Sequence, residues 1–475
     1  MTAPTSRAED RLDRPVGIDA IGVYVPRLYV DLTGEWATAR APALTRGDVE
    51  KLVGKVIEGV GVRRMAVVDA HQDCATLAAM AAKRVIDASG IDPREIDYLA
   101  VGTETTVDQS KSMAAYVLGM LERHYGVSLA EVGAPQFQFA CIGATYALEA
   151  AVSRIRAGEN TKRYSLIIAS DISKYPLRTP GEYTQGAGAV ALLVSEDPRV
   201  LVLDRGVTGT VTRDERDFFR PNGQTSAVVD GKYSIDVYLD CIEAAFDAYA
   251  RRARVRLGVG FERLYDAVEA FFFHVPFPRM AEYASARVFG RLWSATPEVR
   301  ARLAAEGLSS ETMPRKDFEK ALARSALFRA AFDAKVAPSL TLAREVGNIY
   351  SGALYMGLAS YLEETSARDL AGKRVVLGSY GSGASAKVLS GVIAPGYRAL
   401  VDGLDHRREL RGESDGGQRV ALSVAEYERL HEQSDRERGA SLRAPRSEFV
   451  LERLGTSETP DRTDVGYRYY GWVDG

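Results

Sequence analysis

The chain has few cysteines, few histidines and almost no excess of charge of either sign, and each shortage excludes a class of protein. Its three cysteines, Cys74, Cys141 and Cys241, are too few and too scattered for a disulfide framework. None belongs to a Cys-x-x-Cys pair, so we expect no metal site. Basic residues number 61 and acidic residues 64, and the two kinds are interspersed, which gives no footprint for nucleic acid or an anionic membrane.

Long apolar runs are also missing. The first 15 residues are polar and charged, without an apolar core or a small-residue cleavage site, so residues 1–15 are expected to form a loose tail. No stretch is long enough to span a bilayer. With cysteine scarce as well, we expect a cytoplasmic protein that has no membrane partner.

From residue 16 onward, short apolar runs alternate with amphipathic segments, which predicts an α/β protein with parallel strand pairing. The apolar runs that indicate strands are Val16–Val25, Ile96–Gly102, Gln136–Ala140, Ser165–Ser170, Gly186–Ser195, Val200–Val211, Ala270–Pro276, Arg374–Ser379 and Ala386–Ile393. The amphipathic segments that indicate helices are Thr76–Ser89, Ser110–Tyr125, Thr145–Ala157, Ile235–Ala253 and Gly347–Glu364.

No linker rich in proline, glycine or serine interrupts this pattern, which favours fused units over separate domains. We predict two similar halves, residues 16–199 and 200–402, although no sequence repeat proves a duplication. Residues 403–475 form a charged C-terminal extension. That extension and the stretch Thr296–Lys316 are dense in Arg, Glu and Asp, so both are expected to be solvated surface.

Cys141 is the first candidate for chemistry. It stands in the phrase QFACIGATYALEAA, between a predicted strand and a predicted helix. A thiol at that junction faces the positive end of a helix dipole, which favours the thiolate, and its small neighbours leave room for an acyl group. The alternative is a buried and inert cysteine, which is our interpretation of Cys74 and Cys241.

Glu104 lies just beyond the carboxyl end of a predicted strand, in the phrase LAVGTETTVDQSKS, where ligand crevices of α/β sheets are found. A carboxylate between hydroxyls and a buried strand end could have a raised pKa and serve as an acid or a base. The alternative for this cluster, which also holds Asp108 and Ser110, is a helix cap.

His274 follows three phenylalanines and stands before Val275 and Pro276, at an element boundary where catalytic groups are often held. The alternative is a satisfied core histidine. The remaining histidines lie in polar stretches and are expected to be exposed: His71, His124, His406 and His431.

Further along, the segment Gly378–Lys387 reads GSYGSGASAK and follows a predicted strand. Such a loop lets backbone N–H groups approach a ligand, as an oxyanion hole requires, although a plain turn fits equally. It lacks the Gly-Lys-Ser/Thr ending of a phosphate-binding P-loop. Asn348 stands at the start of a predicted helix, where it could cap that helix or bind a ligand.

Taken in order, Glu104, Cys141, His274, Asn348 and the Ser382 loop resemble the hydroxymethylglutaryl-CoA synthase family of the thiolase superfamily. The resemblance covers about residues 16–400. Its most specific pieces are GTETTVDQSKS, FAC with GAT, ASDISKY, TQGAGAVALLV, DFFRPNG with VDGKYSIDVYL, FHVPF, VGNIYSGALY and GSYGSGA.

The resemblance implies a five-layered α/β/α/β/α thiolase fold, a homodimer, and condensation of acetyl-CoA with acetoacetyl-CoA without any cofactor. Cys141 would carry the acetyl group and Glu104 would move protons. His274 and Asn348 would position the acetoacetyl group, while the backbone amides of Cys141 and Ser382 would stabilise the oxyanion. The residues that would line or support the substrate pocket are Asp171, Tyr175, Thr184, Asp217 and Ser234.

The sequence departs from the family pattern in three places, one of which is the charged insertion near Thr296 together with the long C-terminal tail. Ile142 stands where many members have tyrosine. Tyr283 stands where a lysine often holds a CoA phosphate and supplies no charge, whereas Arg279, at the neighbouring lysine position, still can.

These departures leave a second interpretation open, in which the acceptor is a β-ketoacyl group on a polyketide carrier protein. A third, an initiating ketoacyl-carrier-protein synthase or thiolase, is disfavoured because those relatives lack a glutamate at the place of Glu104. A fourth, a catalytically inactive scaffold, is disfavoured because Glu104, Cys141 and His274 are all present.

Overall fold

A computed structural model describes residues 14–224, 226–401, 405–411, 419–433, 438–456 and 464–475. Its centre is a ten-stranded sheet. The strands along that sheet are, in spatial order, β12 (Ala270–Phe273), β13 (Arg374–Gly381), β14 (Ser385–Ile393), β8 (Leu201–Leu203), β1 (Val16–Tyr24), β7 (Gly186–Glu196), β6 (Tyr164–Ser173), β4 (Ile96–Gly102) and β5 (Gln136–Phe137), with β9 (Gly209–Thr212) beside β14.

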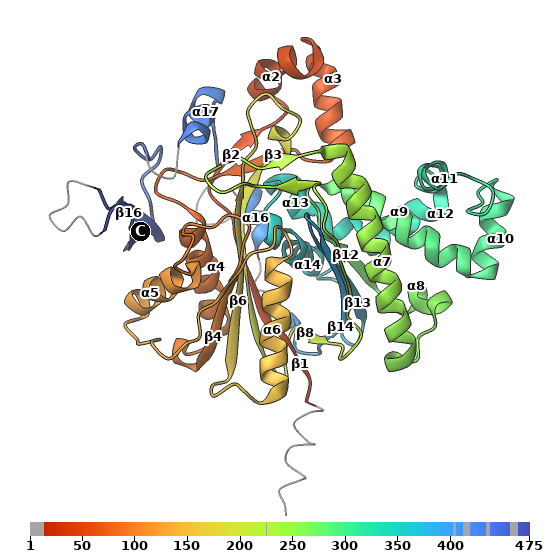
Figure 1. The fold of residues 1–475 in the computed structure, drawn as a ribbon, viewed down its shortest axis with the longest axis horizontal. Helices are drawn as coiled ribbons and strands as arrows, with labels where there is room; N and C mark the ends of the chain where they lie inside the picture. Colours follow the sequence, from red (N-terminus) through yellow and green to blue (C-terminus); the bar gives the residue numbers. More distant parts are fainter. Residues whose placement is uncertain (1–13, 225, 402–404, 412–418, 434–437, 457–463) are drawn as a thin grey trace, which may run out of the picture.

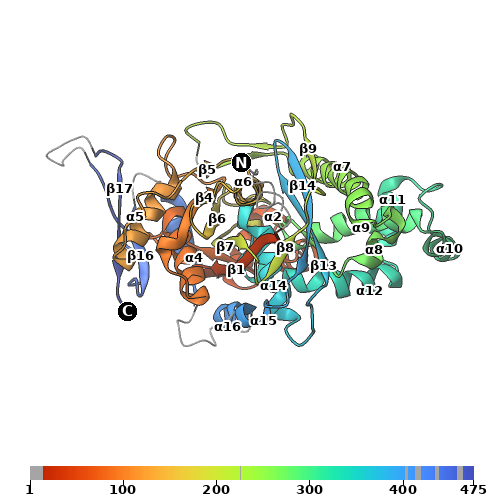
Figure 2. The same ribbon diagram turned by 90° about the horizontal axis from the view of Figure 1, so that it is seen from below.

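Helices cover the part of the sheet around β1, β6 and β7 and the part around β9, β13 and β14, and further helices fill the space between these two parts (Figures 1 and 2). On the outside, α4 (Cys74–Ser89) packs on β1, β6 and β7, and α7 (Gly231–Leu257) packs on β9, β13 and β14. Between them, α6 (Gly143–Ala157) packs on β4 and β6, and α14 (Ala353–Glu364) packs on β12 and β13. The order is therefore helix, sheet, helix, sheet, helix, and the predicted five-layered thiolase-like α/β fold is confirmed.

The remaining elements surround these layers. They are β2 (Leu28–Asp31), α2 (Glu35–Thr45), α3 (Val49–Gly54), β3 (Arg64–Val67), α5 (Met113–Tyr125), β10 (Phe218–Phe219), β11 (Val228–Val229), α8 (Leu264–Ala267), α9 (Pro278–Ala295), α10 (Pro297–Ala305), α11 (Arg315–Leu322), α12 (Ala326–Lys335), α13 (Thr341–Val346) and α15 (Arg398–Val401). No helix in the described ranges is long and apolar enough to cross a membrane.

Two predicted elements are shorter than expected, and in each case a residue with positive φ lies in the part that is not strand or helix. The strand predicted at Gln136–Ala140 ends at Phe137, and Ala140 has φ 40°. The helix predicted at Gly347–Glu364 begins only at Ala353, because Gly347 has φ 82° and ends α13. Asn348 therefore lies in the link between two helices and not at a helix start.

Two further segments divide differently. The run Val200–Val211 forms two strands, β8 and β9, in place of one. Most of the glycine- and serine-rich segment Gly378–Lys387 is strand, since β13 ends at Gly381 and β14 begins at Ser385. Only the turn between those two strands remains as the predicted loop, and it contains Ser382.

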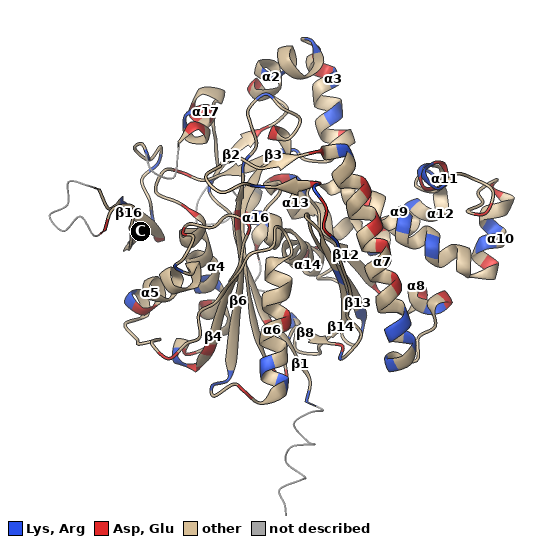
Figure 3. Ribbon diagram, viewed as in Figure 1, with Lys and Arg blue, Asp and Glu red and all other residues tan. Residues whose placement is uncertain are grey.

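The charged stretch after α9 is anchored to α7 by ion pairs. Figure 3 shows acidic residues along α7 and basic residues on α9 and α11. Arg315 on α11 reaches Glu243 at 3.1 Å, and Lys316 on α11 reaches Asp236 at 2.8 Å. The lobe α10–α12 is thus fixed to the body by charge as well as by its apolar residues.

The C-terminal extension is folded onto the body, so the prediction that it is solvated surface is wrong for much of it. It contains α16 (His406–Arg411), β15 (Val420–Ala421), α17 (Val424–Glu432), β16 (Glu448–Leu454) and β17 (Arg468–Val473). Phe449 and Tyr470 are buried in the same apolar cluster as α4 and α5. Arg468 makes a buried ion pair with Asp73 at 2.8 Å. The sequence did not indicate this packing, because the extension has only a few apolar residues and they are scattered among many charged ones.

His406 was expected to be exposed but is buried. Its Nε2 lies 3.3 Å from the backbone N–H of Val23, and its other ring nitrogen bonds Glu363. It therefore ties α16 to β1 and α14.

Candidate active site

Cys141 sits in a tight turn between β5 and α6. Ala140, directly before it, has φ 40°, and α6 begins two residues later at Gly143. The start of α6 presses on the end of β4, where a Cβ added at Gly102 would lie 2.1 Å from the backbone nitrogen of Ala144. The position of the thiol is thus set by backbone contact between two elements.

We expect Gly102→Ala to displace the start of α6 and with it Cys141. Real Cβ atoms do not approach a backbone nitrogen that closely, so the helix must shift. Acyl transfer to Cys141 should fall by at least about 100-fold, because misplacement of a reacting group by about 1 Å has an effect of that size. Rates of acetylation measured by intact mass spectrometry check this. Gly119→Ala, which meets only the tip of the Arg123 side chain, is the matched control and should keep the wild-type rate.

The Cys141 thiol is surrounded by aromatic rings and by acids. Tyr175, Phe218 and Tyr350 form a small buried cluster against which Cys141 packs. Burial raises the pKa of the thiol well above its usual value, and the carboxyl groups of Glu104, Asp171 and Asp217 raise it further. The expectation that the helix dipole favours the thiolate is therefore wrong for the unliganded protein, and the thiol must lose its proton when it reacts.

Glu104 follows β4 and is buried. Burial raises the pKa of its carboxyl group to about 7, although Arg220 opposes this rise. Its Oε2 has no hydrogen-bond partner among the described residues. The predicted raised pKa is confirmed, and a carboxyl group with a pKa near neutrality is suited to both giving and taking a proton.

Asp171 organises the loop that carries Glu104. Its Oδ1 accepts hydrogen bonds from the backbone N–H of Glu104 at 2.8 Å and from the Thr103 hydroxyl at 2.9 Å. Its Oδ2 accepts from the backbone N–H of Ser351 at 3.0 Å. Both oxygens are used within the protein, so Asp171 supports the site and does not offer a free ligand.

Arg220 is a neighbour of Glu104 that the sequence did not reveal. Its guanidinium lies 2.5 Å from Glu104 Oε1 and 2.5 Å from the backbone oxygen of the same residue. Arg220 follows β10, whose Phe218 belongs to the aromatic cluster at Cys141. This arginine holds the Glu104 side chain and lowers its pKa.

We expect Arg220→Met to move the pH dependence of the Glu104-dependent step to higher pH. The guanidinium favours the carboxylate, so without it the pKa of Glu104 rises above about 7. The rising limb of a profile of rate against pH should then move to higher pH in Arg220→Met. In Arg220→Lys the limb should lie close to its wild-type position. An unshifted limb in Arg220→Met would show that another group titrates there.

Asp217 plays a similar organising part on the other side of the site. Its carboxylate accepts from the Tyr380 hydroxyl at 2.8 Å, from the backbone N–H of Gly383 at 2.8 Å and from the Ser234 hydroxyl at 3.1 Å. These bonds fix the turn that contains Ser382. That turn lies against the Cys141 loop, since a Cβ added at Gly381 would be 2.9 Å from the backbone nitrogen of Ile142.

Ile142 itself is fully buried at this contact, where its side chain packs against Gly381. The residue that departs from the family pattern therefore fills the interior between the two loops.

His274 follows β12 and is buried beside the rings of Tyr238 and Tyr380. Burial lowers the pKa of its imidazole to about 3, so it is neutral at physiological pH. Tyr380 connects it to Asp217 and to the Ser382 turn. Asn348 is also buried, and its side-chain oxygen accepts a hydrogen bond from the backbone N–H of Tyr350 at 2.8 Å.

The segment that carries Tyr175 is held by α17 from the C-terminal extension, which the sequence also did not reveal. The Gln185 side chain accepts from the backbone N–H of Tyr175 at 2.5 Å and donates to the Tyr427 hydroxyl at 2.7 Å. His431 Nε2 lies 2.9 Å from the Tyr175 backbone oxygen, and burial lowers the pKa of His431 to about 4. His431 was expected to be exposed and is instead partly buried.

Of the other predicted binding residues, Thr184 contacts Asn348, whose backbone N–H donates to the Thr184 backbone oxygen at 3.1 Å. The hydroxyl of Thr184 donates to the backbone oxygen of Gly181 at 2.8 Å. At the start of α9, Arg279 is partly exposed and pairs with Glu282 at 2.8 Å, and Tyr283 is exposed. Within the described residues, no hydrogen bond or ion pair joins Arg279 to the cluster around Cys141.

Comparison with known proteins places this site in a family. Residues 12–198 match the model described as hydroxymethylglutaryl-coenzyme A synthase N terminal, and residues 201–436 match the corresponding C-terminal model. The hydroxymethylglutaryl-CoA synthase of Haloferax volcanii is 30% identical over 455 residues, which cover 93% of this chain and 97% of that protein. The synthase of Enterococcus faecalis is 34% identical over 417 residues, covering 87% and 91%.

Solved structures similar to this chain belong to the same family. One is described as MvaS in complex with 3-hydroxy-3-methylglutaryl coenzyme A, with 33% identity, a TM-score of 0.80, and coverage of 97% of this chain and 100% of that one. Another is the HMG synthase of the curacin biosynthetic pathway in complex with an acetyl donor-ACP, with 26% identity, a TM-score of 0.76 and the same coverage.

Proposed function

Because the chain belongs to the hydroxymethylglutaryl-CoA synthase family, whose members are acyl-CoA-condensing enzymes, we propose that it joins acetyl-CoA to acetoacetyl-CoA to give 3-hydroxy-3-methylglutaryl-CoA. This product belongs to the mevalonate route to isoprenoids. The observation that carries the proposal is that the Glu104 carboxyl group, whose pKa burial raises to about 7, lies close enough to the Cys141 thiol to raise the pKa of that thiol.

The reaction starts on the Cys141 sulfur. It attacks the thioester carbonyl of acetyl-CoA, loses its proton, and CoA leaves as the free thiol. Glu104 then takes a proton from the methyl group of the acetyl thioester. The resulting carbanion attacks the ketone carbon of acetoacetyl-CoA, and Glu104 returns the proton to the new tertiary alkoxide. Water cleaves the thioester to Cys141, which releases the product and restores the thiol.

The other residues hold the reacting groups. The backbone N–H groups of Cys141 and Ser382 stabilise the oxyanion, and the contact between their two loops supports this pairing. His274, neutral because it is buried, and Asn348 position the acetoacetyl group. Arg279 takes a CoA phosphate outside the buried cluster. The thioester itself acidifies the methyl group, so the residues need no cofactor.

A direct assay tests this function. Purified protein is given acetyl-CoA and acetoacetyl-CoA, and loss of acetoacetyl-CoA is measured together with formation of 3-hydroxy-3-methylglutaryl-CoA. The proposal requires both, together with an acetyl adduct on Cys141 when acetyl-CoA is present alone. An adduct without turnover of free acetoacetyl-CoA excludes the proposed acceptor.

The second candidate is condensation onto a β-ketoacyl group bound to a carrier protein. Tyr283 favours it, because this exposed residue of α9 supplies no charge for a CoA phosphate. The HMG synthase of the curacin biosynthetic pathway in the comparison is in complex with an acetyl donor-ACP. Replacing free acetoacetyl-CoA by the same group on a carrier protein in the assay decides between the two acceptors.

We also propose a homodimer. Among the described strands, β5 pairs only with β4 and ends the sheet, and it leads into the Cys141 turn. A second copy pairing there would cover an open strand edge. Sedimentation or light scattering that gives a single chain of 51.7 kDa would refute this.

A further inference from the structure

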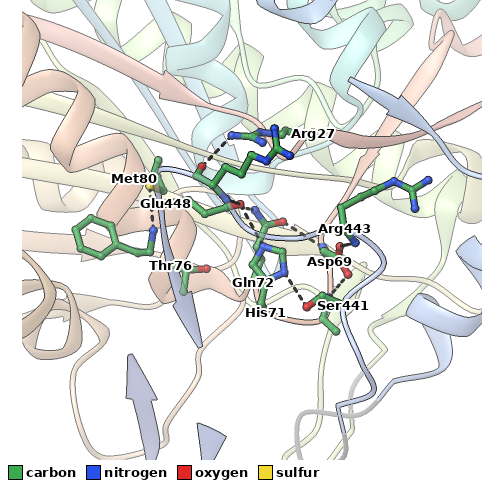
Figure 4. Close-up of polar contacts among 12 residues, drawn as sticks. Arg27, Asp69, His71, Gln72, Thr76, Met80, Ser441, Arg443 and Glu448 are labelled. Carbon is green, nitrogen blue, oxygen red and sulfur yellow. Dashed lines mark hydrogen bonds and ion pairs between the residues drawn. The ribbon is translucent and has the colours of Figure 1, made fainter. Parts of the chain in front are cut away.

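A second cavity lies on the side of the molecule where the C-terminal extension meets the body, and none of its lining residues belongs to the site described above. It has a volume of about 260 Å³. It is bordered by the start of β2, the loop before α4 and the segment that leads into β16 (Figure 4). Its charged or titratable lining residues are Arg27, Asp69, His71, Arg443, Arg446 and Glu448.

The two acids of this cavity are already engaged by donors of the protein. Asp69 accepts from the backbone N–H groups of Leu442 at 2.8 Å and of Arg443 at 2.9 Å. Glu448 accepts from the Gln72 side chain at 2.8 Å and from the Arg446 backbone N–H at 3.2 Å (Figure 4). Both carboxylates therefore serve to fasten the extension to the body.

The three arginines are far less engaged. The Arg27 guanidinium donates to the Arg446 backbone oxygen at 2.9 Å. That of Arg443 donates to the neighbouring Leu442 backbone oxygen and lies 3.8 Å from Glu426. In the described part of the chain, the Arg446 guanidinium makes no hydrogen bond or ion pair. Three positive charges thus border a cavity whose two negative charges are occupied.

A histidine also lines the cavity. The His71 side chain is only 10% exposed, and its Nδ1 bonds the Ser441 hydroxyl at 2.9 Å. Its Nε2 lies 3.4 Å from Glu448 Oε1. Glu448 is thus the partner of this nitrogen, and the His71 ring forms part of the cavity wall.

We propose that this cavity binds a phosphoryl group, either as inorganic phosphate or pyrophosphate or as the phosphate end of a small metabolite. Guanidinium groups present planar pairs of donors that match phosphate oxygens, and three of them fit a multiply charged anion better than a single carboxylate. The bound group joins Arg27, which directly precedes β2, to Arg443 and Arg446 of the extension, so it reinforces the attachment of the extension to the body.

Calorimetric titration of the full chain tests the proposal. Phosphate, pyrophosphate and glycerol 3-phosphate are titrated at one ionic strength set with KCl, with acetate as the singly charged control. We expect saturable binding of one anion per chain, weaker by about tenfold in Arg27→Ala and in Arg446→Ala because each loses charged hydrogen bonds. Tighter binding of glycerol 3-phosphate than of phosphate points to a metabolite, and the reverse order to the inorganic anion.

Three controls make the test decisive. Arg453→Ala removes an exposed arginine of β16 outside the cavity and should keep wild-type affinity. Arg279→Ala should also keep it, since that residue is proposed to take a CoA phosphate elsewhere. Arg446→Lys keeps the positive charge but lacks the planar pair of donors. It replaces Arg446→Ala in the titration if that variant does not fold.

Absence of binding above the acetate level, or equal binding in wild type and both cavity variants, overturns the proposal. Binding that is lost only in Arg279→Ala also overturns it. The condensation assay reports on the Cys141 site, to which no lining residue of this cavity belongs, so failure of one proposal is distinguishable from failure of the other.

Discussion

Cys141→Ala is expected to abolish both the acetyl adduct and the condensation. The reaction proposed here begins with a bond to the Cys141 sulfur, and alanine offers no atom that replaces it. Removal of a nucleophile that works together with other catalytic groups lowers kcat by about a million-fold in well-studied enzymes. Intact mass spectrometry after acetyl-CoA alone, followed by the condensation assay, measures both effects.

The chain provides two matched controls. Cys74 and Cys241 are both buried, yet neither belongs to the aromatic cluster around Cys141. Cys74→Ala and Cys241→Ala should therefore retain the adduct, the second with some loss of stability because Cys241 is in the main core. An adduct that persists in Cys141→Ala, or that disappears in Cys241→Ala, would assign the acetyl group to a different residue.

The pH dependence of acetylation follows from the same surroundings. Burial and three neighbouring carboxyl groups raise the pKa of the Cys141 thiol, so the neutral thiol dominates at pH 7. We therefore expect the acetylation rate to increase with pH through and beyond neutrality.

The sequence predicted that Glu104 and Cys141 each follow an apolar strand, and the structure shows that these two strands are neighbours. Each follows an apolar strand, and β4 and β5 pair in parallel, so both residues leave the sheet at the same edge. A neighbouring strand, β6, ends in the segment that carries Asp171, which binds the Glu104 loop. This part of the site follows from local sequence patterns and from the rule that parallel neighbouring strands end at the same edge of a sheet.

Contacts between distant segments could not be predicted in the same way. Arg220 reaches Glu104 across 116 positions, from an irregular segment around β10 that has no periodic pattern. Gln185 meets Tyr427 across 242 positions, and Tyr427 belongs to a part of the chain dense in charge. Such a composition indicates surface on average, and it says nothing about the few apolar residues that bury one face of α17.

Glu104→Gln is expected to leave acetylation of Cys141 intact and to stop condensation. Glutamine keeps the size and the polar atoms of the side chain but does not take a proton from the acetyl methyl group. Loss of a general base lowers rates by about 100- to 10,000-fold. The measurement is the fraction of acetylated enzyme at steady state, which should approach one when acetoacetyl-CoA is present and product does not form.

The wild-type pH profile should report the same group. Only the Glu104 carboxylate takes a proton, and its pKa is about 7, so the condensation rate should rise as the pH increases through 7 and then level off. Glu104→Gln should have no such limb in its residual activity. A limb of the same shape in the variant would assign the titration to another group.

The same substitution should stabilise the protein at alkaline pH. The pKa of Glu104 is raised in the folded state, so its contribution to stability is present below pH about 4.5 and is lost as the pH rises through about 7. Above pH 7 the wild type therefore buries a carboxylate at a net cost on the order of 3 kcal/mol, which glutamine avoids. Denaturant unfolding at pH 5 and pH 8 measures the difference, with Glu95→Gln on the surface as control. If Glu104→Gln is no more stable than wild type at pH 8, the carboxylate is better solvated than its burial indicates, and the base is less reactive than proposed.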